Sequence, residues 1–157
     1  MKKKLQRCEW PKDDALMQAY HDHEWGIPVH DDTKHFEFLI LDAFQAGLSW
    51  KTILHRREGF RKAFVNFDVK KVAKFNDKHV EKLMQDVGII RNRLKITGTI
   101  KNAKAFIVIQ KEFGSFDKYI WQFTKNKIIE GKRKTIKDIP ATSKESDTMS
   151  IDRKSVV

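Results

Sequence analysis

The stretch from His30 to Leu54 reads HDDTKHFEFLILDAFQAGLSWKTIL, and its pattern predicts how the chain folds. Polar residues that can cap a helix come first, and apolar residues then recur at steps of three and four, at Phe36, Leu39, Ile40 and Ala43. This period marks one buried face of an α-helix, which we expect to end at Gly47. Ser49 can cap a second helix, whose apolar positions are Trp50, Ile53 and Leu54.

The helical period continues on both sides of this stretch. Further helices are expected to start at Asp13 or Asp14, Asp68, Asn76 or Asp77, close to Arg91, and at Ser115, with Gly114 as a C-cap. Breakers are scarce, with seven Gly and three Pro, and no alternation of period two is sustained. The pattern therefore predicts an all-α fold without a substantial sheet. Beyond Thr124 we expect a basic loop over 125–137, a turn at 138–140, and a last helix capped by Thr142 or Ser143.

The composition predicts one globular domain with an anionic partner. The 157 residues are 40% hydrophobic and 34% charged, which is typical of a folded body rather than a disordered one. A net charge of +11 makes nucleic acid the first candidate partner. The lysines are spread along the chain, which favours a basic face over a basic tail. The alternative is a protein that is merely rich in lysine.

Several classes of protein are unsupported by the sequence. Cys8 is the single cysteine, so no internal disulfide can form, which fits a reducing cytoplasm. No apolar run approaches the roughly 20 residues of a membrane span. No apolar segment follows the basic N-terminus, so it does not resemble a signal peptide. The chain also has neither a phosphate-binding glycine loop nor a nucleophile elbow, which argues against nucleotide hydrolases and serine esterases.

A helical hairpin around Gly88 is the first candidate functional feature. A tight turn before a helix presents free backbone N–H groups, which can bind a phosphate oxygen. Arg91, Arg93 and Lys95 follow directly and add positive charge. This pattern suits binding of a DNA backbone without regard to sequence. The alternative is an ordinary corner between two helices, which also uses glycine.

Aromatic and acidic residues in the first third of the chain are the second feature. Trp10, Tyr20, Trp25 and Trp50 can stack on a flipped base, and ring faces also attract a cationic base. Asp42 lies at the edge of the apolar helix face, and the turn after it can bring Trp50 beside it. Together they could form a pocket of one carboxylate and several rings. The alternatives are that the rings fill the core and that Asp42 caps a nearby helix.

Cys8 and His21 are candidate zinc ligands, but a structural zinc site needs four. His23, His30 and His35 lie nearby without the spacing of a zinc finger. A structural cysteine and a surface histidine are the alternative.

Five sequence blocks resemble those of the DNA-3-methyladenine glycosylase I family. They are RCEW at 7–10, YHDHEWGIP at 20–28, QAGLSW at 45–50, GIIRNR at 88–93 and FGSF at 113–116. The resemblance extends from about residue 7 to residue 150, and the second and third blocks together are highly specific. It implies a fold of the helix-hairpin-helix glycosylase type. It also implies a monomeric, monofunctional enzyme that hydrolyses the N-glycosidic bond of 3-methyladenine in double-stranded DNA during base excision repair.

The resemblance also implies roles for particular residues. The pocket aromatics of the family match Trp10, Tyr20, Trp25 and Trp50, and its DNA-gripping hairpin matches Gly88, Ile90, Arg91 and Arg93. The base-reading carboxylate, typically Glu in the best-known members, matches Asp42. The charge is thus kept on a side chain that is one methylene shorter.

The family's structural zinc is bound by Cys and His near each end of the chain. Cys8 and His21 match the first pair, whereas the second pair, in a His-x-x-x-Cys segment, is absent. From Ile151 to Val157 the sequence departs from the family pattern. We therefore interpret residues 1–157 as a single helical glycosylase domain without its C-terminal segment, and expect impaired zinc binding. A truncated, non-catalytic DNA-binding member of the family is the second hypothesis, and a basic helical protein with an acidic partner is the third.

Overall fold

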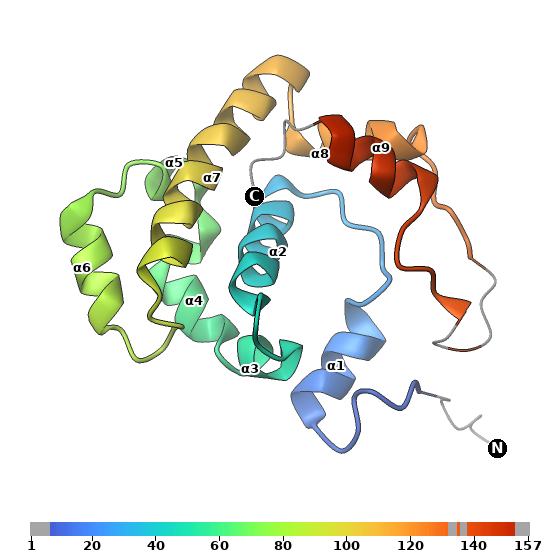
Figure 1. The fold of residues 1–157 in the computed structure, drawn as a ribbon, viewed down its shortest axis with the longest axis horizontal. Coiled ribbons are helices and arrows are strands. Elements are labelled where there is room, and N and C mark those ends of the chain that lie inside the picture. Colours follow the sequence, from blue (N-terminus) through green and yellow to red (C-terminus); the bar gives the residue numbers. More distant parts are fainter. Residues whose placement is uncertain (1–6, 132–134, 136–137, 153–157) are drawn as a thin grey trace.

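The computed structural model describes residues 7–131, Thr135 and 138–152 of the chain, and these residues form helices without any strand. In order, the elements are α1 (Ala15–His23), α2 (Asp32–Gln45), α3 (Trp50–His55), α4 (Arg57–Ala63), the 3-10 turn η1 (Val65–Phe67), α5 (Val69–Val72), α6 (Asp77–Gln85), α7 (Arg93–Phe113), α8 (Phe116–Trp121), the 3-10 turn η2 (Gln122–Thr124) and α9 (Lys144–Asp152) (Figure 1). The all-α prediction is confirmed for this part of the chain. None of its helices is both long and apolar enough to cross a bilayer.

The helix starts follow the capping residues that the sequence predicts. The side chains of six N-cap residues each accept a hydrogen bond from a backbone N–H in the first turn, at Asp14, Asp31, Ser49, Asp68, Asn76 and Ser115. Gly114 ends α7 with φ at 86°, in the left-handed region that glycine adopts at little steric cost. These local signals therefore set most boundaries.

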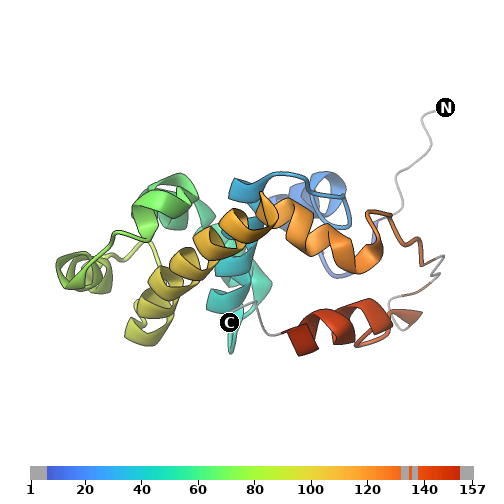
Figure 2. The same ribbon diagram turned by 90° about the horizontal axis from the view of Figure 1, so that it is seen from above.

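Helix α2 lies at the centre of the molecule, as Figures 1 and 2 show. Its buried face of Phe36, Ile40, Leu41 and Phe44 joins a core built with α4, α5, α6, α7 and α8. The long helix α7 crosses this core, and α6 lies at the edge of the molecule and contributes Val80 and Leu83 to the core. On the other side of α2 are α1 and α9. The residues of α2 on the opposite face do not enter the core. They face α1 instead.

One boundary and one whole helix differ from the sequence prediction. Helix α7 begins at Arg93, two residues after the expected start, because the side chain of Asn92 accepts from Lys95 N and caps the helix there. Helix α4 was not predicted. It contains a buried arginine, Arg57, whereas a sequence pattern assigns charged residues to the outer face of a helix.

Candidate functional site

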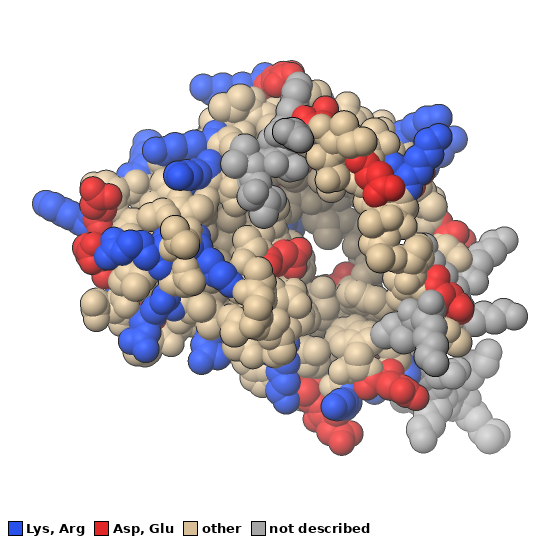
Figure 3. All heavy atoms as spheres, in the orientation of Figure 1, with Lys and Arg blue, Asp and Glu red and all other residues tan. Residues whose placement is uncertain are grey.

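A cavity of about 370 Å³ lies between α1, α2 and α3 and the turn around Ile139. Its lining residues are Trp10, Met17, Tyr20, Trp25, Asp42, Gln45, Trp50 and Ile139. Figure 3 shows the molecule hollowed on this side of α2. The structure thus brings together all five residues that the sequence singled out for a ring-and-carboxylate pocket.

The four predicted rings line the same cavity, and they contact one another edge to face or at a tilt. The Trp10 ring centre lies 5.4 Å from that of Trp25 and 6.2 Å from that of Tyr20. Tyr20 lies 5.2 Å from Trp50. Rings in contact hold one another in place, and none of the four is fully buried. They offer aromatic surface to a planar guest.

Asp42 is the carboxylate of this cavity. It lies one turn before the end of α2, on the side away from the core, and its side chain is open to the solvent of the cavity. Among the described residues it has no hydrogen-bond or ion-pair partner. Partial burial among the cavity walls raises the pKa of Asp42, because it removes water that would hydrate the charge. A cation bound here would supply the missing partner.

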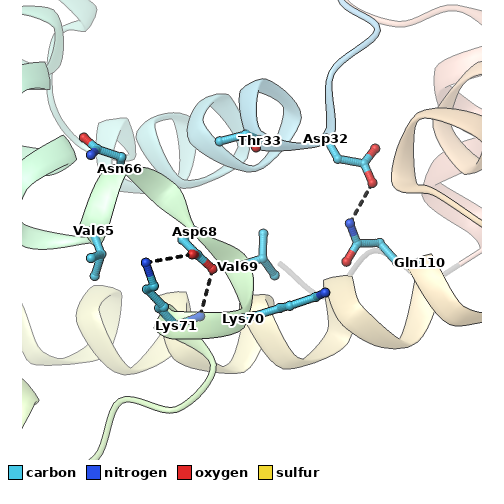
Figure 4. A pocket seen from close by; sticks show the side chains of 9 residues that line it. All are labelled: Asp32, Thr33, Val65, Asn66, Asp68, Val69, Lys70, Lys71 and Gln110. Carbon is cyan, nitrogen blue, oxygen red and sulfur yellow. Dashed lines mark hydrogen bonds and ion pairs between the residues drawn. The ribbon is translucent and has the colours of Figure 1, made fainter.

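A second cavity, of about 420 Å³, lies on the far side of α2 near α5 and α7. Figure 4 shows Asp32 turned toward Gln110 and Asp68 turned toward Lys71. Asp32 accepts a hydrogen bond from Gln110, and Asp68 pairs with Lys71. Its lining residues include no aromatic ring, and both of its carboxylates have partners. This cavity therefore lacks the chemistry of the first.

The hairpin predicted around Gly88 is formed by α6, residues 86–92 and the start of α7. Gly88 N–H donates to Asp86 Oδ1 at 2.7 Å, so this amide is already occupied. The amides of Ile90 and Arg91 have no acceptor among the described residues, and the Arg91 side chain is exposed and without an ion pair there. Arg93 forms an ion pair with Glu81 at 2.7 Å. The open amides therefore lie just before α7.

Glycine is needed at position 59 on α4, because the backbone of α4 meets the backbone of this turn there. A Cβ atom added to Gly59 on α4 would lie 2.2 Å from the carbonyl oxygen of Gly88. The close approach fixes the turn against the body of the protein. Figure 3 shows several Lys and Arg side chains over the α6 and α7 side of the molecule.

The candidate zinc ligands Cys8 and His21 lie next to each other. Cys8 N–H donates to His21 Nε2 at 3.4 Å, and the His21 ring stacks on Trp25 with centres 5.6 Å apart. His21 Nδ1 lies 2.9 Å from Asp22 Oδ1. The described residues contain no group of three or more His, Cys, Asp or Glu that could hold a metal ion. The pair fits half of a zinc site at most.

Comparison with known proteins identifies the family. The model of the methyladenine glycosylase family matches residues 10–156. DNA-3-methyladenine glycosylase 1 of Escherichia coli is 41% identical over 146 residues, which are 93% of this chain and 78% of the relative. The chain belongs to the methyladenine glycosylase family.

Solved structures of family members have the same fold. A crystal structure of 3-methyladenine DNA glycosylase I superposes with a TM-score of 0.90 at 37% identity, covering 96% of this chain and 84% of the other. The Staphylococcus aureus enzyme, whose structure addresses 3-methyladenine recognition, has a TM-score of 0.90 at 29% identity, with coverage of 96% and 81%. The predicted resemblance is confirmed.

The structure of this family member corrects one sequence inference. Lys95 was expected to add charge to the DNA-binding hairpin, but its Nζ donates to the carbonyl oxygens of Phe44 at 2.8 Å and Ala46 at 2.6 Å. Carbonyls at a helix C-terminus lack partners within the helix and attract cations. Lys95 therefore ties the start of α7 to the end of α2, close to Asp42.

Three cavity residues were missed from the sequence. Gln45 lies one turn after Asp42 on α2, so the helical period could have found it. Met17 lies one turn before Tyr20 on α1, but its apolar side chain suggested only core packing. Ile139 comes from a distant turn, and no local signal connects it with the others.

Proposed function

We propose that this family member excises alkylated, positively charged adenine, above all 3-methyladenine, from double-stranded DNA in base excision repair. The observation that carries the proposal is the unpaired carboxylate of Asp42 in a cavity lined by four rings. The names of its relatives, DNA-3-methyladenine glycosylases, support the same substrate. We expect it to act as a monomer in the cytoplasm.

The cavity residues bind the base after it is flipped out of the duplex. Trp10, Tyr20, Trp25 and Trp50 stack on or surround the purine, and ring faces attract its positive charge by about 0.5–2 kcal/mol. Ionised Asp42 accepts a hydrogen bond from the base edge and balances that charge. A neutral base gains neither interaction to the same degree, so the cavity favours the alkylated base.

Bond cleavage then needs little activation, because the alkylated base is already a good leaving group. A water oxygen forms a bond to the sugar C1′ while the bond from C1′ to the base nitrogen breaks. The electron pair of that bond neutralises the base, and the proton of the water passes to solvent. Neutral 3-methyladenine and an abasic site are the products.

The hairpin before α7 is proposed to hold the DNA backbone. The open amides of Ile90 and Arg91, just before α7, suit a phosphate oxygen, and the exposed Arg91 side chain adds a cation. The close approach of Gly59 to Gly88 holds the turn in place, and Arg93 can exchange Glu81 for a phosphate. Such contacts do not depend on the base sequence, and they weaken as the salt concentration rises.

Zinc binding by the 157-residue chain is proposed to be weak. A structural zinc is held by four ligands, and the described residues bring together only Cys8 and His21.

Release of bases from methylated duplex DNA tests the proposal. We expect the wild-type chain to release 3-methyladenine and the Asp42→Asn variant to release it about 100-fold more slowly, since one preorganised electrostatic contact is lost. Asp13→Asn, an exposed site at the start of α1, is the matched control and should keep full activity. Full activity in Asp42→Asn would overturn the proposed role. Salt-sensitive DNA binding with no release by the wild type would indicate a non-catalytic DNA-binding member instead.

A further inference from the structure

We propose that Arg57 is a positioning residue that fixes the positions of the aromatic rings of the cavity, although it does not line the cavity itself. This inference rests on the proposed function. Arg57 lies at the start of α4, with only 8% of its side chain exposed. Its guanidinium contacts two side chains that support cavity rings. Glu24 precedes Trp25 in the chain, and Phe38 contacts Tyr20 and Trp50.

The first support is Glu24, at the end of α1. Arg57 Nη1 and Nη2 donate to its two carboxylate oxygens at 2.7 and 2.8 Å, a bidentate pair that fixes direction as well as distance. The amides of Glu24 and Trp25 both donate to the carbonyl of Tyr20 at 2.9 Å. The turn that carries Trp25 is thus fixed to α1 through its backbone and to α4 through Glu24.

The second support is Phe38, a partly buried residue of α2 that lies one turn before Asp42. Arg57 Cζ lies 5.1 Å from its ring centre, within the range of a cation–π contact. The Phe38 ring lies 6.3 Å from Tyr20 and stacks on Trp50 with centres 6.4 Å apart. One guanidinium therefore supports three of the four cavity rings, Trp25 through Glu24 and the other two through Phe38.

Arg57 acts on the cavity through geometry rather than through charge. The cluster around it contains three cations and three carboxylates: Lys34, Arg57, Arg61, Glu24, Glu37 and Glu58. It has no net charge, which leaves Asp42 as the unbalanced charge of the cavity. If charge alone mattered, replacing Arg57 by a neutral residue would strengthen binding of a cationic base, because it would leave an excess of acid nearby.

The geometry also explains the need for arginine. Arg57 serves Glu24 with two nitrogens and Glu37 with Nε at 2.9 Å while its flat face lies over Phe38. A lysine keeps the charge but not the planar fork, so it cannot make these contacts together.

The test compares Arg57→Lys with the control Arg61→Lys. Arg61 binds the same Glu37 at 2.7 Å, but among the described residues its guanidinium pairs with Glu37 and Glu58 and not with Glu24 or Phe38. Each protein is labelled with 5-fluorotryptophan, and ¹⁹F NMR reports on its four tryptophans, of which Trp121 on α8 serves as the internal reference. Affinity for free 3-methyladenine is measured by tryptophan fluorescence.

We expect Arg57→Lys to shift the Trp25 and Trp50 resonances, leave that of Trp121 unchanged, and weaken 3-methyladenine binding by about 10–100-fold, as small displacements of binding groups do. Arg61→Lys should change neither the resonances nor the affinity. Should Arg57→Lys fail to fold, Glu24→Gln breaks the same support at a side chain that is 32% exposed, and the same shifts are expected.

Unchanged Trp25 and Trp50 resonances with wild-type affinity would overturn the proposal. The resonances are read without DNA or base release, so the two proposals fail separately. Resonance shifts in a chain that binds no 3-methyladenine would contradict the proposed function alone. Normal binding without shifts would contradict only the positioning role.

Discussion

Substitution of Glu37 by glutamine is expected to destabilise the protein strongly. Glu37 is only 4% exposed, yet it is ionised, because Arg57, Arg61 and Lys34 all donate to it. Two of these bonds come from Arg57, at 2.9 and 3.2 Å, and Arg61 donates at 2.7 Å. Glutamine keeps the size of the side chain but removes the charge, which leaves buried Arg57 and its neighbouring cations with one carboxylate too few.

The size of the effect follows from the pKa of Glu37. Burial alone would raise this pKa, but the hydrogen bonds from Arg57 and Arg61 outweigh burial and lower it from 4.5 to about 2. Each pKa unit corresponds to about 1.4 kcal/mol, so ionised Glu37 contributes about 3 kcal/mol to stability at neutral pH. Breaking a buried ion pair by removing one partner costs about 3–5 kcal/mol, in agreement. This is a large part of the roughly 5–15 kcal/mol that a domain has.

Urea unfolding followed by circular dichroism measures the change at neutral and at acidic pH. A carboxyl group with a lowered folded-state pKa adds stability that is complete above its ordinary pKa of 4.5 and is lost as the pH falls towards 2. The difference between wild type and Glu37→Gln should therefore shrink over that window. Glu58→Gln, at a 74% exposed site, is the control and should change stability little. A loss below about 1 kcal/mol at neutral pH, or one that persists unchanged in acid, would refute the reasoning.

Three other predictions concern the hairpin, the end of α2 and zinc. Gly59→Ala should destabilise the protein by about 1–3 kcal/mol and weaken DNA binding, because the new methyl group meets Gly88 O at 2.2 Å. Lys95→Met should lower the free energy of unfolding by about 1–3 kcal/mol, because two carbonyls of the α2 end lose a charged donor. Purified 157-residue chain should hold well under one zinc per molecule by metal analysis, because Cys8 and His21 form half a site at most.

Each of these predictions has a control and a contrary result. Gly98→Ala, where no atom lies within 4 Å of the added Cβ, should not destabilise the protein. Equal stability of Gly59→Ala and Gly98→Ala would show that the backbones do not meet. Lys101→Met, at an exposed site on α7, should be neutral, and an equal loss there would remove the case for Lys95. One tightly bound zinc per chain would contradict the account of the metal.

Local signals in the sequence predicted most of the fold. Asp14, Ser49 and Asn76 cap their helices because a short polar side chain satisfies amides only a few residues away. The same locality explains why Gly114 was predicted as a C-cap. Helix α7 starts two residues later than expected because the side chain of Asn92 caps it.

Contacts between distant segments were harder to predict. The cavity rings were singled out by residue type, but Ile139 joins them only through tertiary packing. Lys95 looked like a surface cation because the sequence does not show that α7 starts beside the end of α2. Arg57 was missed because a buried ion pair has the same composition as a solvated helix face.

The pH dependence of base release in Asp42 variants tests the central claim most directly. Wild-type release of 3-methyladenine from methylated DNA should decline as the pH falls through the pKa of Asp42, which burial raises above the ordinary aspartate value. Asp42→Glu should retain activity with a similar acid limb, whereas Asp42→Asn should be slow at every pH and show no such limb. Release by Asp42→Asn at the wild-type rate, with the same acid limb, would contradict the claim that this carboxylate draws the cationic base into the cavity.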